Sequence, residues 1–275
     1  MIYKCADTHK DLILDFLKVD QLTNLFVIAD IERFGFDSLD QDVWAYTNEI
    51  DEIEGILLRY KDIAIPVHGE DFSGLDTFLP LLQSLNEIKV ISGGKEAVNQ
   101  YVDHFPNLDR SDTIISVCEK LLEYPQSMNR VEELDKSSIP AYFAWQKECF
   151  ETVSESELVL SELLDNQDVM IKIIKNEKNE IISSGRLSAE SSTAAMITRI
   201  GTIKAEESNG YATTITAALT QYCLEKNKKA CLFYNNPAAG SVYHHIGYQD
   251  TTKNWVMLKP KKEENKKNLF QELIS

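Results

Sequence analysis

The stretch TIKAEESNGYATTITAALTQYCLEKNKKACLFYNNPAAGSVYHHIGY, residues 202–248, decides the fold class of this chain. Its pattern predicts a strand, a tight loop, a helix, a second strand, a short helix and a third strand. Gly210 stands where the loop turns into the first helix, while Asn236-Pro237 begins the second helix and Gly247 ends it. Since unpaired amides and the positive end of the helix dipole meet at a helix N-terminus, the sequence predicts a phosphate-binding site around Gly210.

The residues around this stretch extend the same alternation of strands and helices. The first helix carries its apolar side chains on one stripe, from Tyr211 through Ile215 to Leu219, as a helix packed on a sheet does. Residues 230–234 (ACLFY) are apolar on both faces, which is typical of a central parallel strand. Upstream, the pattern predicts helices over 139–150 and 155–164, and strands over 169–175, 181–187 and 196–203.

The N-terminal half repeats this order of elements. Its pattern predicts strands over 43–47, 53–59, 62–67 and 88–91, and helices over 75–85 (interrupted by Pro80) and 95–104. The loops before the two main helices, residues 70–74 and 206–210, also look alike. We therefore expect an α/β (α+β) protein that contains a tandem repeat, with a single mixed sheet extended at its N-terminus as the alternative. The expected boundaries are a first domain over 1–124, a linker over 125–138, a second domain over 139–260 and a tail over 261–275.

Composition excludes several classes of function. The formal net charge is −16, from 28 basic and 44 acidic side chains, which argues against binding to nucleic acid or to an anionic membrane. The acidic surface suits a cationic small substrate, although solubility explains it equally well. No apolar run approaches the ~20 residues of a membrane helix, and the N-terminus lacks the layout of a signal peptide. The 5 cysteines are scattered without metal-type spacing, so we expect no metal and a cytoplasmic location.

Three motifs from residue 202 onward make residues 139–258 resemble the GNAT superfamily of acyl-CoA-dependent N-acyltransferases. They are Thr202-Ile203 at a strand end, Ser208-Asn209-Gly210-Tyr211-Ala212 in the loop, and Asn236-Pro237-Ala238-Ala239 followed by Val242-Tyr243 and Ile246-Gly247-Tyr248. The resemblance implies two GNAT-like mixed-sheet domains in tandem, each with a central sheet flanked by helices. The N-terminal copy is then degenerate and shapes the acceptor pocket, because Asp71 and Phe72 stand where cofactor binding favours small or basic residues.

The resemblance also implies a reaction and a set of site residues. An amine of a small molecule or peptide attacks the thioester of acyl-CoA, with acetyl-CoA as the expected co-substrate, and no metal takes part. Tyr243 is the expected catalytic residue, because a phenol there can protonate the leaving thiolate or stabilise its charge. The residues expected to bind the cofactor are Thr202, Ile203, Ser208, Asn209, Gly210, Tyr211, Ala212, Thr213 and Asn236. The family often has a strand bulge here, expected near Gly201, where strand amides polarise the thioester carbonyl.

The chain departs from the family pattern in the loop itself. Glu207 stands where the family has Gln or Arg, Glu206 precedes it, and Ser208 replaces the first glycine. Two carboxylates oppose a pyrophosphate, whereas the backbone donors remain. A catalytically inactive acyl-CoA-binding or sensing module is therefore the alternative function. An ordinary nucleotide-binding protein fits less well, because the Walker lysine and the dinucleotide glycine fingerprint are missing.

Two further features of the site stay open at the level of sequence. No general base is assigned: Glu190 is expected in a solvated turn, and His244 and His245 are expected on the surface of the second helix. The acceptor amine is not identified, and a homodimer is a candidate assembly.

Overall fold

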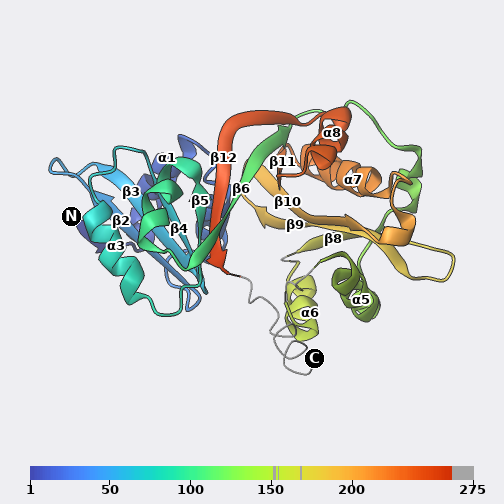
Figure 1. The fold of residues 1–275 in the computed structure, drawn as a ribbon, viewed down its shortest axis with the longest axis horizontal. Helices are drawn as coiled ribbons and strands as arrows, with labels where there is room; N and C mark the ends of the chain where they lie inside the picture. Colours follow the sequence, from blue (N-terminus) through green and yellow to red (C-terminus); the bar gives the residue numbers. More distant parts are fainter. Residues whose placement is uncertain (151–152, 154, 168, 262–275) are drawn as a thin grey trace, which may run out of the picture. The chain divides into compact units, whose positions relative to one another are not determined.

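The computed structural model describes residues 1–150, 153, 155–167 and 169–261, and it divides into two compact units (Figure 1). Unit 1 contains Met1–Phe16, Phe36–Asp112 and the segment that begins at Trp255. Unit 2 contains Leu17–Gly35 and Thr113–Asn254. The chain therefore passes between the units at four places, so neither unit is one continuous stretch of sequence.

Unit 1 is a sheet with helices on its faces. Its strands are β1 (Ile2–Lys4), β2 (Gln41–Thr47), β3 (Ile53–Tyr60), β4 (Ile63–His68), β5 (Val90–Gly94) and the second half of β12 (Gln249–Pro260). Its helices are α1 (Lys10–Lys18, which ends in unit 2), α3 (Leu75–Ser84) and α4 (Lys95–Val98), and β6 (Leu108–Cys118) begins in it. The strand order is β1-β2-β3-β4-β5-β12, and β4–β5 is its parallel pair. Pro80 lies inside α3, as the sequence predicts.

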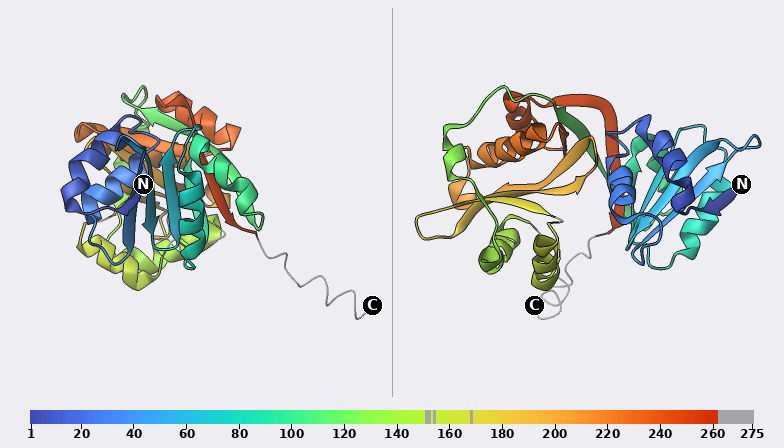
Figure 2. Two further views of the ribbon diagram at one scale, coloured as in Figure 1. Left: turned by 90° about the vertical axis from the view of Figure 1, so that its left-hand side faces the viewer. Right: turned by 180° about the vertical axis from the view of Figure 1, so that it is seen from behind.

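Unit 2 repeats this architecture. Its strands are β7 (Glu132–Glu133), β8 (Met170–Lys175), β9 (Ile181–Glu190), β10 (Ala194–Thr202), β11 (Lys229–Tyr234) and the second half of β6. Its helices are α2 (Leu25–Phe34), α5 (Ile139–Cys149), α6 (Glu157–Asp165), α7 (Tyr211–Glu225) and α8 (Pro237–Ile246). The strand order is β7-β8-β9-β10-β11-β6, and β10–β11 is its parallel pair. Helices α7 and α8 cover one face, and α5 and α6 cover the other (Figure 2).

The two units therefore share one topology, and the tandem repeat predicted from sequence is confirmed. In each unit four successive strands, β1 to β4 or β7 to β10, lead to a helix and then to a strand, β5 or β11, that is parallel to the fourth. An antiparallel strand then closes the sheet. In unit 1 that closing strand is β12, where Trp255 pairs with Gly94, and in unit 2 it is β6, where Cys118 pairs with Ala230. Each sheet is thus closed by a strand taken from the other half of the sequence.

Because each unit takes its closing strand from the other half of the sequence, the unit boundaries differ from the expected ones. The expected boundaries were a first domain over 1–124, a linker over 125–138 and a second domain over 139–260. Helix α2 belongs to unit 2, because Leu25 and Ala29 are buried against Ala194 and Met196 of its sheet. The end of β12 belongs to unit 1, because it pairs with β5. The expected linker 125–138 contains β7, which pairs with β8 at the sheet edge. The expected tail lies outside the described residues after Lys261.

The core of unit 2 fixes the helix that carries the candidate site. Ile215 and Leu219 of α7 are fully buried against Ile197 and Leu232 on the inner strands of the sheet. Burying such aliphatic side chains is worth ~1.5–3 kcal/mol each, so the position of α7 is tightly determined. The polar N-terminus of α7 consequently emerges at a defined point beyond the end of β10.

Candidate functional site

The N-terminus of α7 presents backbone donors that the helix itself does not use. Gly210 holds the left-handed conformation (φ 77°, ψ 7°), and the first helical hydrogen bond runs from the Thr214 amide to the Gly210 carbonyl at 3.0 Å. No side chain caps this end. The amides of Tyr211, Ala212 and Thr213 therefore have no partner within the helix, and they lie where the helix dipole favours an anion.

These donors open onto a cavity of about 530 Å³ within unit 2. It is lined by Ile200, Thr202, Glu206, Glu207, Ser208, Gly210, Tyr211, Ala212, Thr213, Asn236, Ala239, Val242 and Tyr243. Most of the site residues expected from the sequence thus meet around one cavity.

Two of the expected site residues do not line the cavity. The Asn209 side chain turns back and donates to the Glu206 carbonyl and carboxylate, both at 3.2 Å. The Ile203 side chain packs into the apolar core, and its amide donates to Ile182 O at 2.9 Å. That amide is therefore already used, so it does not suit the role of polarising a thioester carbonyl.

A β-bulge lies at the point where β10 leaves β11. The parallel pairing of these strands runs only from Ala194 to Ile197, and the pairing of β10 with β9 skips from Thr198 to Gly201. Arg199, in between, has φ 51°. Ile200 and Thr202 then point into the cavity. The expected bulge near Gly201 is confirmed, and it lets β10 reach the cavity beyond its ladder with β11.

Tyr243 lies on α8 and forms part of the cavity wall. Its half-buried ring packs edge-on against Tyr234, with centroids 5.7 Å apart, and is tilted against Tyr248 at 5.9 Å. Burial raises the pKa of Tyr243 above its usual range, so the phenol stays protonated at neutral pH. Among the described residues its hydroxyl has no hydrogen-bond partner, which leaves the proton available to a ligand.

The second helix is held in place by its own capping residues. The Asn236 side chain accepts a hydrogen bond from the Ala238 amide at 3.0 Å, and Pro237 takes the first position of α8. Sequence reasoning missed Ala239 and Val242, which line the cavity beside Tyr243. Ala239 lies three residues before Val242 and four before Tyr243, and this spacing was the available signal, because residues three and four apart share a helix face.

Both acidic residues of the loop, Glu206 and Glu207, line the cavity. Within the described part of the chain neither carboxylate forms an ion pair. The negative charge of Glu207 acts on Cys149. The pKa of Cys149 is raised to about 11, mainly by burial and further by the nearby charges of Glu148 and Glu207. The carboxylates therefore oppose the same anion that the α7 amides favour.

The two histidines of α8 lie away from the cavity. His244 Nε2 lies 3.0 Å from Asp250 Oδ1, and His245 Nε2 contacts Glu123 Oε2. These contacts agree with surface roles for both. Glu190, expected in a turn, is instead the last residue of β9 and pairs with Lys228 at 2.8 Å.

The corresponding place in unit 1 is filled by an aromatic side chain. Phe72 is 9% exposed, stacks on His68 with centroids 4.1 Å apart, and lies edge-on to Tyr46. A Cβ at Gly55 or Gly74 would lie only 2.6 Å from the Phe72 ring. Gly74, which precedes α3, has φ −91° rather than the left-handed value of Gly210. The loop before α3 is therefore closed by its own side chain.

Over the described residues, groups of three or more His, Cys, Asp or Glu side chains suited to a metal ion are not found. Among the described helices, none combines the length and apolar character needed to cross a membrane.

Comparison with known proteins places this architecture among acetyltransferase structures. Neither a protein-family model nor a curated protein matches the sequence. A GCN5-related N-acetyltransferase-like protein from Streptococcus suis matches with TM-score 0.60 and 11% identity, over 92% of this chain and 100% of its own. A GNAT-family acetyltransferase from Colwellia psychrerythraea matches with TM-score 0.56 and 12% identity, over 95% and 100%.

One similar structure bears directly on the repeat. A tandem GNAT protein from the clavulanic acid biosynthesis pathway matches with TM-score 0.56 and 10% identity, over 95% of this chain and 99% of its own. The resemblance recognised in the sequence is thus confirmed for the fold, including its tandem arrangement. At these identities the comparisons establish the fold alone.

Proposed function

We propose that this protein is an N-acyltransferase that moves an acetyl group from acetyl-CoA to the amine of a small molecule or peptide by direct attack. The observation that carries the proposal is the cavity of unit 2, where the N-terminus of α7, the bulged end of β10 and Tyr243 meet. Donors for a pyrophosphate, a strand end for the pantetheine arm and a protonated phenol are the parts that acyl transfer from a thioester needs.

The described residues fit acyl-CoA through their backbone. The amides of Tyr211, Ala212 and Thr213 would hold the pyrophosphate, and a Cβ added to Gly210 would meet nothing within 4 Å, so a ligand can approach the backbone there. A basic side chain, which commonly assists pyrophosphate binding, is absent from the described lining of this cavity. The carboxylates of Glu206 and Glu207 also disfavour the negatively charged pyrophosphate. We therefore expect binding that depends on the backbone geometry of the loop.

Tyr243 would supply the proton for the departing thiolate. Its neutral form is favoured by burial, so activity should not decline at alkaline pH until the raised pKa of Tyr243 is approached. On the acid side, activity should rise with pH as the acceptor amine, with a pKa of about 10, loses its proton. The attacking nitrogen, rather than Tyr243, would thus set the pH dependence near neutrality.

The first test is an isothermal titration with acetyl-CoA. We expect saturable binding with about one molecule per chain, because Phe72 closes the corresponding loop of unit 1. Binding that saturates at two molecules per chain would contradict the closure of unit 1. A titration without saturable binding would overturn the proposed function. Saturable binding without thiol release across an amine panel would favour the sensing module instead.

The second test is Tyr243→Phe, which removes only the hydroxyl. We expect kcat to fall by roughly 100-fold, which is the lower range of general acid catalysis, with the Kd of acetyl-CoA unchanged. Tyr222→Phe on α7 is the matched control, because Tyr222 lines a different cavity. Unchanged turnover in Tyr243→Phe, measured by thiol release, would remove Tyr243 from the reaction.

A further inference from the structure

The hydroxyl of Tyr243 takes its direction from the way its ring is held. Among the described side chains none hydrogen-bonds this hydroxyl, so the packing of the ring orients it. The ring packs edge-on against Tyr234 and is tilted against Tyr248, with centroids 5.7 and 5.9 Å away. A general acid must keep its proton within hydrogen-bond reach of the leaving atom. The two neighbouring tyrosines therefore decide whether the phenol can serve the departing thiolate.

Tyr248 holds one side of the ring from within the core. Its side chain is 2% exposed, and its hydroxyl lies 2.6 Å from Thr220 Oγ1 on α7. The Thr220 hydroxyl donates its own proton to the Thr216 carbonyl at 2.8 Å, so it accepts the proton of Tyr248. Tyr248 is consequently fixed to α7 and forms a rigid wall behind the Tyr243 ring.

A carboxylate fixes the second neighbour of the ring, Tyr234. The Tyr234 hydroxyl, at the end of β11, donates to Asp250 Oδ2 in the first part of β12 at 2.7 Å. His244 Nε2 of α8 lies 3.0 Å from Asp250 Oδ1 and 3.3 Å from the Tyr234 hydroxyl. Burial, and then the charge of Asp250, raise the pKa of Tyr234 to about 12. The pKa of Asp250 is lowered, because the hydrogen bonds from His244 and Tyr234 outweigh the opposing effect of its partial burial. One charged carboxylate thus ties β11, β12 and α8 together at neutral pH.

The backbone of α8 lies directly against the Tyr234 ring. Gly240 is buried in the middle of the helix, and a Cβ there would lie only 2.5 Å from Tyr234 Cε2. Glycine weakens a helix interior, but here it lets the helix rest on the ring three residues before Tyr243. A phenylalanine at position 234 would fill the same space, so packing alone requires neither the hydroxyl nor the carboxylate. Their presence indicates that the angle of this ring, and with it the placement of Tyr243, is set by the hydrogen bond.

We propose that Tyr234 and Asp250 are positioning residues, which hold the phenol of Tyr243 toward the leaving sulfur of acyl-CoA. This inference rests on the proposed acetyl transfer and adds two residues to it. The described lining of the cavity includes neither side chain, so both act through Tyr243 and not on the ligand. Without the hydrogen bond the Tyr234 ring can turn within its packing, and α8 and Tyr243 shift with it. A displacement of about 1 Å is enough to cost on the order of 100-fold in rate.

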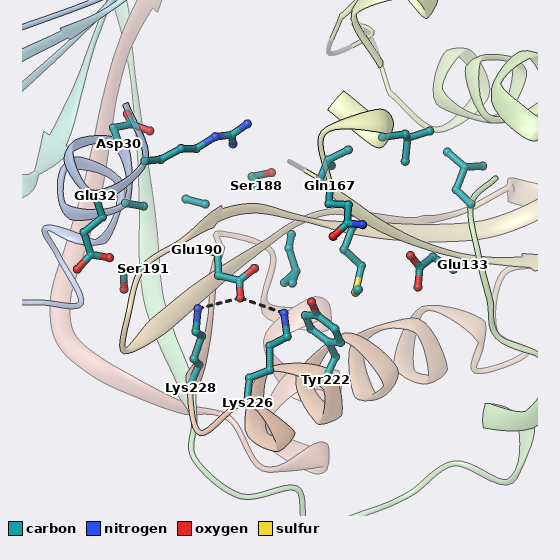
Figure 3. Close-up of a pocket in the computed structure, with 18 of the residues that line it drawn as sticks. Asp30, Glu32, Glu133, Gln167, Ser188, Glu190, Ser191, Tyr222, Lys226 and Lys228 are labelled. Carbon is teal, nitrogen blue, oxygen red and sulfur yellow. Dashed lines mark hydrogen bonds and ion pairs between the residues drawn. The ribbon is translucent and has the colours of Figure 1, made fainter. Parts of the chain in front are cut away.

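The first variant is Tyr234→Phe, which removes the anchored hydroxyl and keeps the ring. With acetyl-CoA and the fastest amine of the acceptor panel, kcat measured by thiol release should fall about tenfold, less than on loss of the Tyr243 phenol itself. The Kd of acetyl-CoA should change less than about twofold, because the amides at the start of α7 are untouched. Tyr222→Phe is the matched control, because Tyr222 lies near the C-terminal end of α7 and lines a second cavity of about 830 Å³ (Figure 3). The control should keep both kcat and Kd.

A double-mutant cycle separates positioning from a merely structural role. In the Tyr243→Phe background there is no phenol proton to position, so adding Tyr234→Phe should lower kcat by less than about twofold. A structural role of the Tyr234 hydroxyl would give the same loss of kcat in both backgrounds. The melting temperatures of the four proteins show that each is folded.

The carboxylate is tested in the same way. Asp250→Ala should lower kcat as Tyr234→Phe does, whereas Asp250→Asn should recover part of the rate, because its amide oxygen can still accept the Tyr234 proton. Glu190→Ala is the matched control, because the Glu190 side chain is 33% exposed, against 34% for Asp250. It binds Lys226 and Lys228, at 3.6 and 2.8 Å, in the second cavity (Figure 3). Its loss should leave kcat unchanged.

The outcomes tell failure of this inference from failure of the proposed function. Wild-type kcat in Tyr234→Phe, or an equal loss of kcat in the Tyr243→Phe background, would overturn the inference and leave the role of Tyr243 standing. Wild-type turnover in Tyr243→Phe alone, or no thiol release by the wild-type protein, would overturn the proposed function and this inference with it. Titration of the same samples with acetyl-CoA distinguishes lost catalysis from lost cofactor binding.

Discussion

Replacing Gly210 by valine should weaken acetyl-CoA binding by tenfold or more. The left-handed backbone at φ 77° costs an ordinary L-residue ~1–2 kcal/mol, and a branched Cβ raises the cost further. The loop would relieve the strain by rotating, which turns the amides of Tyr211 to Thr213 away from their common target. Because a Cβ there would meet nothing within 4 Å, the core should remain intact and the melting temperature should fall little.

Two variants make the Gly210 result interpretable. Gly210→Asn keeps a residue that tolerates the left-handed conformation, so its loss of affinity should be smaller than that of valine. Gly69→Val adds the same bulk at an exposed glycine of unit 1 with open space around it, and should leave the Kd unchanged. If titration gives the wild-type Kd for Gly210→Val, the α7 N-terminus does not bind the cofactor.

The largest loss of stability is expected from Gly247→Ala. Gly247 ends α8 with φ 118°, and a Cβ there would lie 2.5 Å from the backbone oxygen of Lys120. Both the torsion and the clash involve backbone, which cannot move aside as a flexible side chain does. We expect a loss of at least about 3 kcal/mol, or on the order of 10 °C in melting temperature.

Thermal unfolding followed by circular dichroism measures this effect. Gly69→Ala is the matched control, because it adds the same methyl group to an unstrained position and should shift the midpoint by less than about 1–2 °C. A Gly247→Ala protein as stable as Gly69→Ala would mean that the turn after α8 adapts without cost.

The elements predicted well from the sequence are those specified by local signals. The helix after Gly210 was predictable because its apolar stripe, its starting glycine and the buried strand after it all agree. Helix α8 was predictable because Asn236, Pro237 and Gly247 mark its two ends. By contrast, β6 and the first two helices were not predicted, since their places depend on partners distant in sequence. The apolar side of α2 does not reveal that Ala194 and Met196 are what it covers.

The same division holds for the candidate site. The backbone features around Gly210 follow from local sequence, so the loop could be anticipated, whereas the bulge near Gly201 was expected only from the resemblance to the family. The direction of the Asn209 side chain depends on Glu206, and the core packing of Ile203 depends on both faces of the sheet.

The exchange of closing strands has a consequence for how this chain matures on the ribosome. The sheet of unit 1 ends with β12, whose pairing residues Trp255–Leu258 are translated long after its other strands. Until then the outer edge of β5 is an unpaired strand edge, which is a template for aggregation. The nascent N-terminal half therefore cannot mature domain by domain. Translation of unit 1 begins first, yet its sheet is completed only when β12 has been synthesised. A stop codon shortly before residue 255 would remove this closing strand, although the other strands of unit 1 lie more than a hundred residues upstream.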